Sequence, residues 1–253
     1  MKKIKIGLLG FGKTGKPVAN EIIQDSVCDL SWVVREQTDK IEYASHLLGY
    51  EFDQGRIFSQ ADLTDQFFRA HPVDVIVDFS RSEAVREYQG ALELGIPVVS
   101  AISQYNPEDL AMLKSYADRA AIFYSPNITI GVNILMVVAQ ILQRIAPHAD
   151  IEIIEEHFRE KKEVSGTAKK MADILGMGYE KVHSIRVGKT VGKHKIIFGL
   201  PNQTIRLIHE SVDRAAFGQG AIFAAKYVVT QLPGIYTMEQ IISEMFMKNI
   251  PVY

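Results

Sequence analysis

The sequence has little of several residue types, and each shortage excludes a class of protein. Its single cysteine, Cys28, excludes a disulfide within the chain and a cysteine-rich metal site, and fits a reducing compartment. With only 9 prolines and 18 glycines in 253 residues, a collagen-like or disordered chain is excluded. Lysine plus arginine (28) nearly balances aspartate plus glutamate (30), so there is no overall basic field and we expect no nucleic-acid partner.

The sequence also lacks a long uninterrupted hydrophobic run. Its most apolar later stretch, Gly131 to Ile145, contains Asn133 and Arg144 and is too short and too polar to cross a bilayer. The N-terminus begins with lysines, but its apolar run reaches glycines too early for a secretory signal. We therefore expect a cytoplasmic protein without a membrane segment, in which residues 131–145 form a buried helix.

What is present is an ordinary globular composition arranged in an alternating pattern. Hydrophobic residues make up 47% and charged residues 23%, in a length that suits one large domain or two modest ones. Up to about Asn127, apolar runs alternate with helical segments, which predicts an α/β fold, a Rossmann-like doubly wound parallel sheet covered by helices. The expected strands are Ile4–Leu9, Leu30–Val34, Val73–Phe79, Ile96–Ile102 and Ala121–Tyr124. The expected helices are Pro17–Gln24, Asp62–Ala70, Ser82–Leu94 and Pro107–Ala120.

The pattern changes after Asn127. A strand over Ala149–Glu156 and a helix over Gly166–Leu175 are followed by closely spaced strand-like runs, which favours an open, largely antiparallel sheet in an α+β domain. These runs are His183–Val187, Lys195–Phe198 and Thr204–His209, and the expected closing helices are Ala215–Val229 and Met238–Phe246. Three scattered histidines lack metal-ligand spacing and are interpreted as structural or surface residues: His183, His194 and His209.

A glycine-rich loop joins the first strand to the first helix. Gly10-Phe11-Gly12-Lys13-Thr14-Gly15 has the spacing G-x-G-x-x-G, in which the glycines permit a tight turn, approach of the backbone to a pyrophosphate, and close helix packing. The helix start offers free N–H groups to the phosphates. The loop predicts a dinucleotide site, and the alternative is a turn that merely needs glycines.

The end of the second strand is where such folds read the ribose. Arg35 and Glu36 occupy that place, about 20 residues beyond the loop. An arginine pairs a 2′-phosphate and an acid binds the ribose hydroxyls, so Arg35 favours NADPH and Glu36 keeps NADH possible. The alternative is a solvated charge pair at the end of a strand.

The segment 151–168, IEIIEEHFREKKEVSGTA, concentrates reactive side chains. His157 can donate a proton near neutral pH, and Lys161 can hold an anion or supply a proton. Ser165 suits a helix N-cap, and the N–H groups of Gly166 and Thr167 can bind a carboxylate. This combination suits reduction of a C=N or C=C bond in a small acidic substrate. The alternative is a charged strand exit before an ordinary capped helix.

These motifs, in this order, resemble those of the dihydrodipicolinate reductases, NAD(P)H-dependent enzymes of lysine and diaminopimelate biosynthesis. The resemblance covers essentially the full chain, and its most specific blocks are IEIIEEH with SGTA and the run Asn127-Ile128-Thr129-Ile130-Gly131-Val132-Asn133. Further landmarks are Val77-Asp78-Phe79-Ser80 and Phe217-Gly218-Gln219-Gly220-Ala221.

The resemblance implies roles for individual residues. It makes His157 the proton donor and Lys161 the catalytic lysine, and it places a substrate carboxylate on Ser165, Gly166 and Thr167. The implied cofactor-binding residues are Leu9 to Gly15, Arg35, Phe79, Ser100, Ser125, Pro126, Asn127 and Ile128. It also implies a dinucleotide-binding domain of residues 1–128 and 218–253, a substrate and oligomerisation domain of residues 129–217 with an open mixed sheet, a small dicarboxylate substrate, and a homotetramer.

Three departures from the family pattern concern the same expected site. Phe158 replaces the second of two adjacent histidines, which puts in question a polar contact to the substrate. The segment between Lys161 and Ser165 is one residue shorter, which leaves Lys162 as a rival for the catalytic lysine. The family's G-T-T-G is Ser100-Ala101-Ile102-Ser103 here. Reduction of 4-hydroxy-tetrahydrodipicolinate to tetrahydrodipicolinate is the expected activity. The alternatives are an oxidoreductase of another small amino or imino acid and a non-catalytic NADP-binding sensor.

Overall fold

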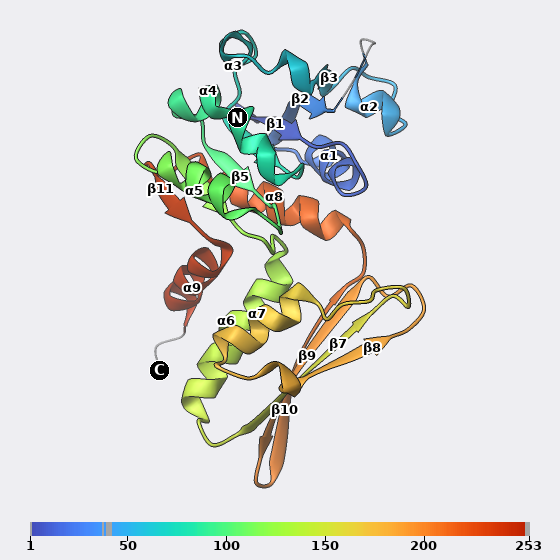
Figure 1. The fold of residues 1–253 in the computed structure, drawn as a ribbon, viewed down its shortest axis with the longest axis vertical. Coiled ribbons are helices and arrows are strands. Elements are labelled where there is room, and N and C mark those ends of the chain that lie inside the picture. Colours follow the sequence, from blue (N-terminus) through green and yellow to red (C-terminus); the bar gives the residue numbers. More distant parts are fainter. Residues whose placement is uncertain (1, 37, 39–41, 251–253) are drawn as a thin grey trace. The chain divides into compact units, whose positions relative to one another are not determined.

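The computed structural model describes residues 2–36, 38 and 42–250. It divides into two compact units, one comprising the chain up to Ile128 with Phe217–Met238, the other Thr129–Ala216 with the chain from Glu239 (Figure 1). This division differs from the expected boundaries in the C-terminal segment, which groups with the second unit. Within the second unit, Lys170 forms an ion pair with Glu239.

The first unit contains the predicted parallel sheet. Its strands are β1 (Ile4–Leu9), β2 (Cys28–Arg35), β3 (Arg56–Ser59), β4 (Val75–Asp78), β5 (Val98–Ser100), β6 (Ala121–Tyr124) and β11 (Gly234–Tyr236). They lie in the order β11-β6-β5-β4-β1-β2-β3, and every pair of neighbours is parallel. The chain therefore reverses its direction of growth between β1 and β4, where such sheets bind ligands.

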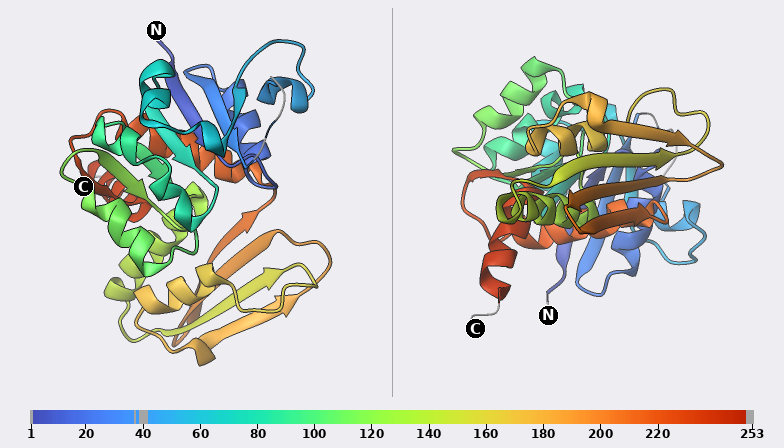
Figure 2. Two further views of the ribbon diagram at one scale, coloured as in Figure 1. Left: turned by 45° about the horizontal axis from the view of Figure 1, so that its top comes forward. Right: turned by 90° about the horizontal axis from the view of Figure 1, so that it is seen from below.

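Helices cover both faces of this sheet, as predicted (Figure 2). They are α1 (Gly15–Gln24), α2 (Ala44–Leu47), α3 (Asp65–Ala70), α4 (Gln89–Glu93), α5 (Pro107–Ser115) and most of α8 (Ala215–Val228). On one face Gly218 of α8 packs against Glu21 and Val18 of α1. On the other, buried side chains of α3, α4 and α5 pack with Trp32 and its strand neighbours. The Trp32 ring lies where a Cβ of Gly7 would be, so the first strand needs a glycine there.

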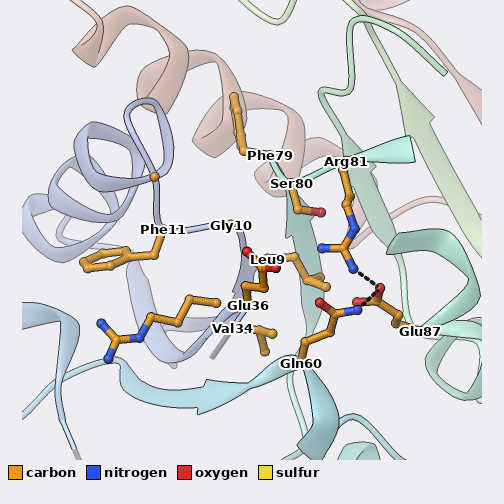
Figure 3. Close-up of a pocket in the computed structure, with 12 residues that line it drawn as sticks. Leu9, Gly10, Phe11, Val34, Glu36, Gln60, Phe79, Ser80, Arg81 and Glu87 are labelled. Carbon is orange, nitrogen blue, oxygen red and sulfur yellow. Dashed lines mark hydrogen bonds and ion pairs between the residues drawn. The ribbon is translucent and has the colours of Figure 1, made fainter. Parts of the chain in front are cut away.

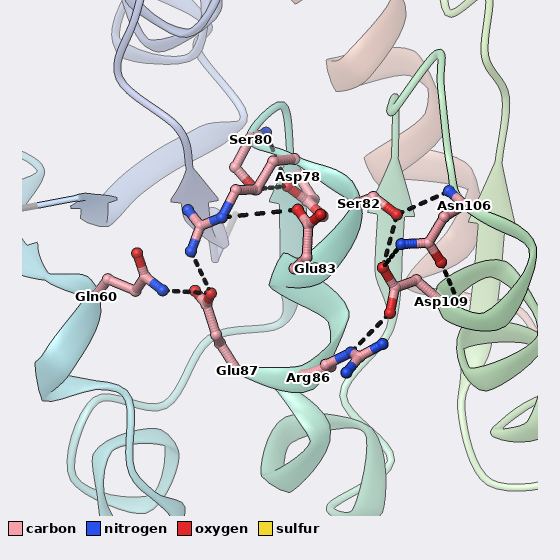
Figure 4. A network of polar contacts seen from close by, with 10 residues as sticks. Gln60, Asp78, Ser80, Ser82, Glu83, Arg86, Glu87, Asn106 and Asp109 are labelled. Carbon is pink, nitrogen blue, oxygen red and sulfur yellow. Dashed lines mark hydrogen bonds and ion pairs between the residues drawn. The ribbon is translucent and has the colours of Figure 1, made fainter.

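The segment 82–94 is not the single helix that the sequence predicts. It forms a 3-10 helix, η2 (Ser82–Arg86), and then the short α4. The break falls around Tyr88, which is fully buried and bonds Asp78 through its hydroxyl at 3.2 Å. Ser82 and Arg86 are likewise held by Asp109 (Figure 4). These tertiary contacts override the local helical preference. The predicted helix at 107–120 also ends early, at Ser115.

The second unit is built on a four-stranded mixed sheet. Its elements are α6 (Ile130–Ile145), β7 (Asp150–His157), α7 (Gly166–Ile174), η3 (Tyr179–Lys181), β8 (Val182–Arg186), β9 (Gly192–Leu200) and β10 (Gln203–Ser211), with α9 (Met238–Asn249) after it in sequence. The order is β10-β9-β7-β8, with β7 and β8 parallel and the other pairs antiparallel. The crossover between β7 and β8 contains α7, which explains their parallel pairing.

The core of this unit lies between its helices and one face of the sheet. Met136 of α6 and Met171 of α7 pack on Ile153, Ile196 and Phe198. The prediction of a buried helix over 131–145 is therefore confirmed. Among the described residues, no helix is both long enough and apolar enough to cross a membrane.

Candidate active site

The glycine loop follows β1 and opens α1, as its motif predicts. Gly10 has φ +93°, and a Cβ there would lie 2.8 Å from the carbonyl oxygen of Phe79. A Cβ on Gly15 would lie 1.9 Å from the carbonyl oxygen of Gly10. A Cβ on Gly12 would meet nothing within 4 Å. The outer two glycines are therefore required by the turn itself, whereas Gly12 leaves space for a ligand.

A cavity of about 650 Å³ opens beside this loop, at the carboxyl ends of β1, β2 and β4 (Figure 3). It is lined by Leu9, Gly10, Phe11, Gly12, Val34, Arg35, Glu36, Gln60, Phe79, Ser80, Arg81 and Glu87. Six of the expected cofactor residues are thus brought together: Leu9, Gly10, Phe11, Gly12, Arg35 and Phe79. The other expected cofactor residues do not line this cavity, and they are Lys13, Thr14, Gly15, Ser100, Ser125, Pro126, Asn127 and Ile128.

Both arginines of the cavity are paired with carboxylates. Arg35 donates to Glu42 at 2.7 Å and to Thr38 at 3.1 Å. Arg81 donates to Glu87 at 2.6 Å, and the same carboxylate accepts a bond from Gln60 (Figure 4). Sequence patterns gave no signal for Gln60 and Glu87, because nothing in their neighbourhood indicates that they face a common cavity.

A buried polar network lies beneath the loop that follows β4. Asp78 is fully buried and accepts hydrogen bonds from Ser80, at 2.9 Å from its backbone N–H and 2.5 Å from its hydroxyl. Burial raises the pKa of Asp78 to about 6 although these bonds oppose it. Ser100 is also buried, and its hydroxyl bonds that of Tyr105 at 2.8 Å. The bonds of Asp78 thereby hold Ser80, which lines the cavity.

The second group of expected site residues gathers on the smaller sheet. Strand register places Glu155 of β7 opposite His194 of β9 and Ser184 of β8, and His157 opposite Arg186. The Nδ1 atom of His157 bonds the Glu155 carboxylate. His157 has no other hydrogen bond among the described residues, so this bond leaves Nε2 available to a substrate.

Glu155 is the centre of this cluster. It is fully buried and accepts bonds from Arg186 through both oxygens, at 2.6 and 2.9 Å, and from the Ser184 hydroxyl at 2.6 Å. Burial alone would raise the pKa of Glu155, but these bonds and the bond from His157 outweigh it and lower the pKa to about 2. The residue is therefore a permanent carboxylate that fixes the imidazole of His157.

The pKa of His157 is lowered, chiefly by burial, and the bond to Glu155 opposes that shift. The Lys161 charge lowers it further. An anionic ligand near Nε2 would favour the protonated form. The site therefore takes up its proton most readily when an acidic substrate is bound.

The remaining expected residues surround this cluster. Lys161 is half-buried and its charge also lowers the pKa of His194, after burial and His157, whereas Lys162 is exposed. Gly166 opens α7, and a Cβ there would meet nothing within 4 Å. Thr167 follows it in the first turn. Phe158 is 39% exposed, so it does not belong to the core.

The expected capping role of Ser165 needs correction here. Ser165 occupies the N-cap position of α7, but its side chain makes no capping bond and instead bonds Nε2 of His194 at 3.0 Å. His194, interpreted from sequence as a structural or surface residue, is buried in the cluster with its ring centroid 5.3 Å from that of His157. The alternation of side chains along β9 could have indicated that His194 is buried, because His194 shares a face with the core residues Ile196 and Phe198.

Two family models together match most of the chain. The model "Dihydrodipicolinate reductase, N-terminus" matches residues 4–128, and "Dihydrodipicolinate reductase, C-terminus" matches residues 131–242. Similar curated proteins include the 4-hydroxy-tetrahydrodipicolinate reductase of Lawsonia intracellularis, 32% identical over 94% of this chain and 98% of that protein. That of Syntrophus aciditrophicus is 30% identical over 92% of this chain and 96% of that protein.

Solved structures agree at the level of the fold. A dipicolinate-bound dihydrodipicolinate reductase from Paenisporosarcina sp. TG-14 has a TM-score of 0.76 at 21% identity, covering 94% of this chain and 99% of that chain. An amine dehydrogenase from Mycobacterium smegmatis has a TM-score of 0.64 at 12% identity, covering 93% and 95%. The resemblance predicted from the motifs is confirmed: the chain belongs to the dihydrodipicolinate reductase family and is an NAD(P)H-dependent oxidoreductase.

Proposed function

We propose that the protein reduces 4-hydroxy-tetrahydrodipicolinate to tetrahydrodipicolinate, the reaction for which its relatives are named. The observation that carries this proposal is His157, whose Nδ1 is held by a buried carboxylate and whose Nε2 is left available. It lies on the same unit as Gly166 at the start of α7, where a Cβ would meet nothing within 4 Å. Because the product lacks the 4-hydroxyl group, the reaction consumes a hydride and a proton and releases water. His157 supplies the proton from Nε2.

The residues around the cavity of the first unit fit a dinucleotide. Gly12 leaves room for a pyrophosphate, and the start of α1 offers N–H groups to it. Bound there, NAD(P)H supplies the hydride. We propose that the nicotinamide half of the cofactor contacts the other expected residues, which are Ser100, Ser125, Pro126, Asn127 and Ile128.

The substrate side of the proposal uses charge. Ser165, Gly166 and Thr167 hold one carboxylate at the positive end of α7, and Lys161 pairs with the substrate. Phe158, being exposed, leaves the second carboxylate one polar contact short of the family pattern.

Steady-state oxidation of NADPH and NADH with freshly generated 4-hydroxy-tetrahydrodipicolinate tests this function. We expect turnover with either cofactor. Turnover only on another imino acid would instead support the second candidate, which Phe158 favours, a relative acting on a substrate without a second carboxylate. Nucleotide binding with no turnover on any imino acid would indicate a sensor.

For cofactor choice, we propose NADPH as the preferred donor through Arg35, which lines the cavity. Arg35→Ala should lower NADPH affinity roughly 10- to 100-fold, since a charge-assisted bond contributes about 1.5–3 kcal/mol. NADH affinity should change little. Fluorescence titration with both nucleotides measures this, and equal losses for the two would assign Arg35 to the fold.

For the catalytic lysine, the half-buried position of Lys161 and its effect on two histidines support it over exposed Lys162. Lys161→Ala should raise KM for the substrate and lower kcat, each by about ten-fold or more. Lys162→Ala is the matched control and should leave both within two-fold. If Lys162→Ala is damaging and Lys161→Ala is mild, Lys162 is the residue that corresponds to the family's catalytic lysine.

We also propose a cytoplasmic homotetramer assembled through the second unit. The face of its sheet opposite the core carries Ile208, 54% exposed, in register with Lys195 and Ile154. Light scattering should give four times the chain mass of 28.3 kDa. Ile208→Glu should lower that mass, and a monomeric wild type would contradict the proposal.

A further inference from the structure

Ser165 and His194 form a buried pair that the proposed chemistry has not yet used. They are 3% and 5% exposed, and they join the start of α7 to β9 through the bond between the serine hydroxyl and Nε2. A serine at an N-cap position ordinarily turns its oxygen to the N–H groups of its own helix. Here it does not, because the Ser165 side chain makes no capping bond to α7.

The direction of the Ser165–His194 bond follows from the other side of the imidazole. Nδ1 of His194 is buried and has no hydrogen-bond partner among the described residues. An unpaired buried N–H is rarer and more costly than an unpaired lone pair, so the proton belongs on Nε2. Nε2–H then donates to the serine oxygen, and the hydrogen of the serine hydroxyl must point to a different acceptor.

We propose that His194 is a positioning residue, which donates to the Ser165 oxygen and thereby aims the Ser165 hydroxyl at the substrate carboxylate bound on the first turn of α7. This inference rests on the proposed function, because only that function places a substrate carboxylate at the start of α7. His194 itself does not touch the reacting atoms in this proposal.

The electrostatics of the pair agree with a neutral donor. Burial, followed by the charges of His157 and His209, lowers the pKa of His194 to about 3. His194 therefore stays neutral while its neighbour His157 gains and gives its proton. A cation in its place would oppose protonation of His157.

Two amide substitutions separate positioning from packing. The amide nitrogen of His194→Gln reaches about where Nε2 lies, and it can donate to Ser165. His194→Asn has the same chemistry but is one carbon shorter, and its amide ends near the position of Nδ1. Ser165→Ala removes the hydroxyl, and the double variant Ser165→Ala with His194→Asn tests whether the two act together.

The readouts are the binding of pyridine-2,6-dicarboxylate by calorimetry, KM and kcat with the substrate, NADH binding, and the melting temperature. We expect His194→Asn and Ser165→Ala each to weaken dicarboxylate binding and to raise KM roughly 10- to 100-fold, as for a bond to a charged group. The kcat should fall less than KM rises. His194→Gln should stay within about three-fold of wild type, and the double variant should be no worse than either single variant.

Equal behaviour of His194→Gln and His194→Asn would overturn the proposal, as would additive losses in the double variant or loss of NADH binding in step with the dicarboxylate. A melting temperature lowered in both amide variants with unchanged dicarboxylate binding would assign His194 to packing alone. Failure of the proposed function looks different, because the wild type itself would then neither bind the dicarboxylate nor turn over.

Discussion

Replacing His157 with glutamine is expected to lower turnover by about 10²–10⁴-fold, the usual loss when a positioned general acid is removed. Glu155 keeps its bonds from Arg186 and Ser184 in this variant, so the buried carboxylate does not lose all its partners. It cannot release a proton to a substrate at neutral pH. Stopped-flow reduction under single-turnover conditions measures the chemical step directly.

Nucleotide binding is the control for this variant. Every residue that lines the cavity proposed for the dinucleotide lies in the first unit, so His157→Gln should bind NADPH and NADH as the wild type does. A variant that retains full turnover would remove His157 from the role of acid. Lys161 would then be the remaining candidate proton donor in the segment.

Replacing Glu155 with glutamine should damage both stability and catalysis. Arg186, which is 19% exposed, would lose its charged partner, and breaking one side of a buried ion pair costs about 3–5 kcal/mol. His157 would lose the carboxylate that orients it and favours its charged form. Denaturant unfolding monitored on the second unit, together with kcat, measures the two effects.

Glu156→Gln is the matched control, because that neighbouring carboxylate points to the opposite face of β7 and is only half-buried. It should change stability by less than about 0.5 kcal/mol. Acid titration adds a second check. The pKa of Glu155 is lowered from 4.5 to about 2, so its contribution to stability is complete above 4.5 and is lost as the pH falls toward 2. That loss should be absent in Glu155→Gln.

The parallel sheet was predictable because its central strands are continuous apolar runs with helices between them. Strands β3 and β11 escaped prediction because they are short edge strands, with Arg56 and Ser59 in one and Gly234 in the other, and lack that signal. The segment 82–94 misled for the opposite reason. Its local pattern is helical, but Tyr88 is drawn to Asp78 by a contact that only the tertiary structure provides.

The site was predictable where its residues follow one another along the chain. His157, Lys161 and Ser165 lie within one segment, and their residue types indicate the chemistry. Arg186 and His194 arrive from other strands, and only the pairing of β7 with β8 and β9 places them beside Glu155. Sequence distance hides such partners, because strand register is decided by the whole sheet.

The register between these strands decides which of their side chains lie on the same face of the sheet as Glu155. Sliding β8 by one residue past β7 would turn Arg186 away from Glu155, and sliding β9 by one residue would turn His194 away from Ser165. Single-residue insertions and deletions in an indel scan would therefore be tolerated at 189–191, beyond the backbone bonds of Val187 and Gly188 to the segment at His157, and would abolish activity within either strand. The alignment of β8 and β9 with β7 is therefore as necessary to the candidate active site as its side chains are.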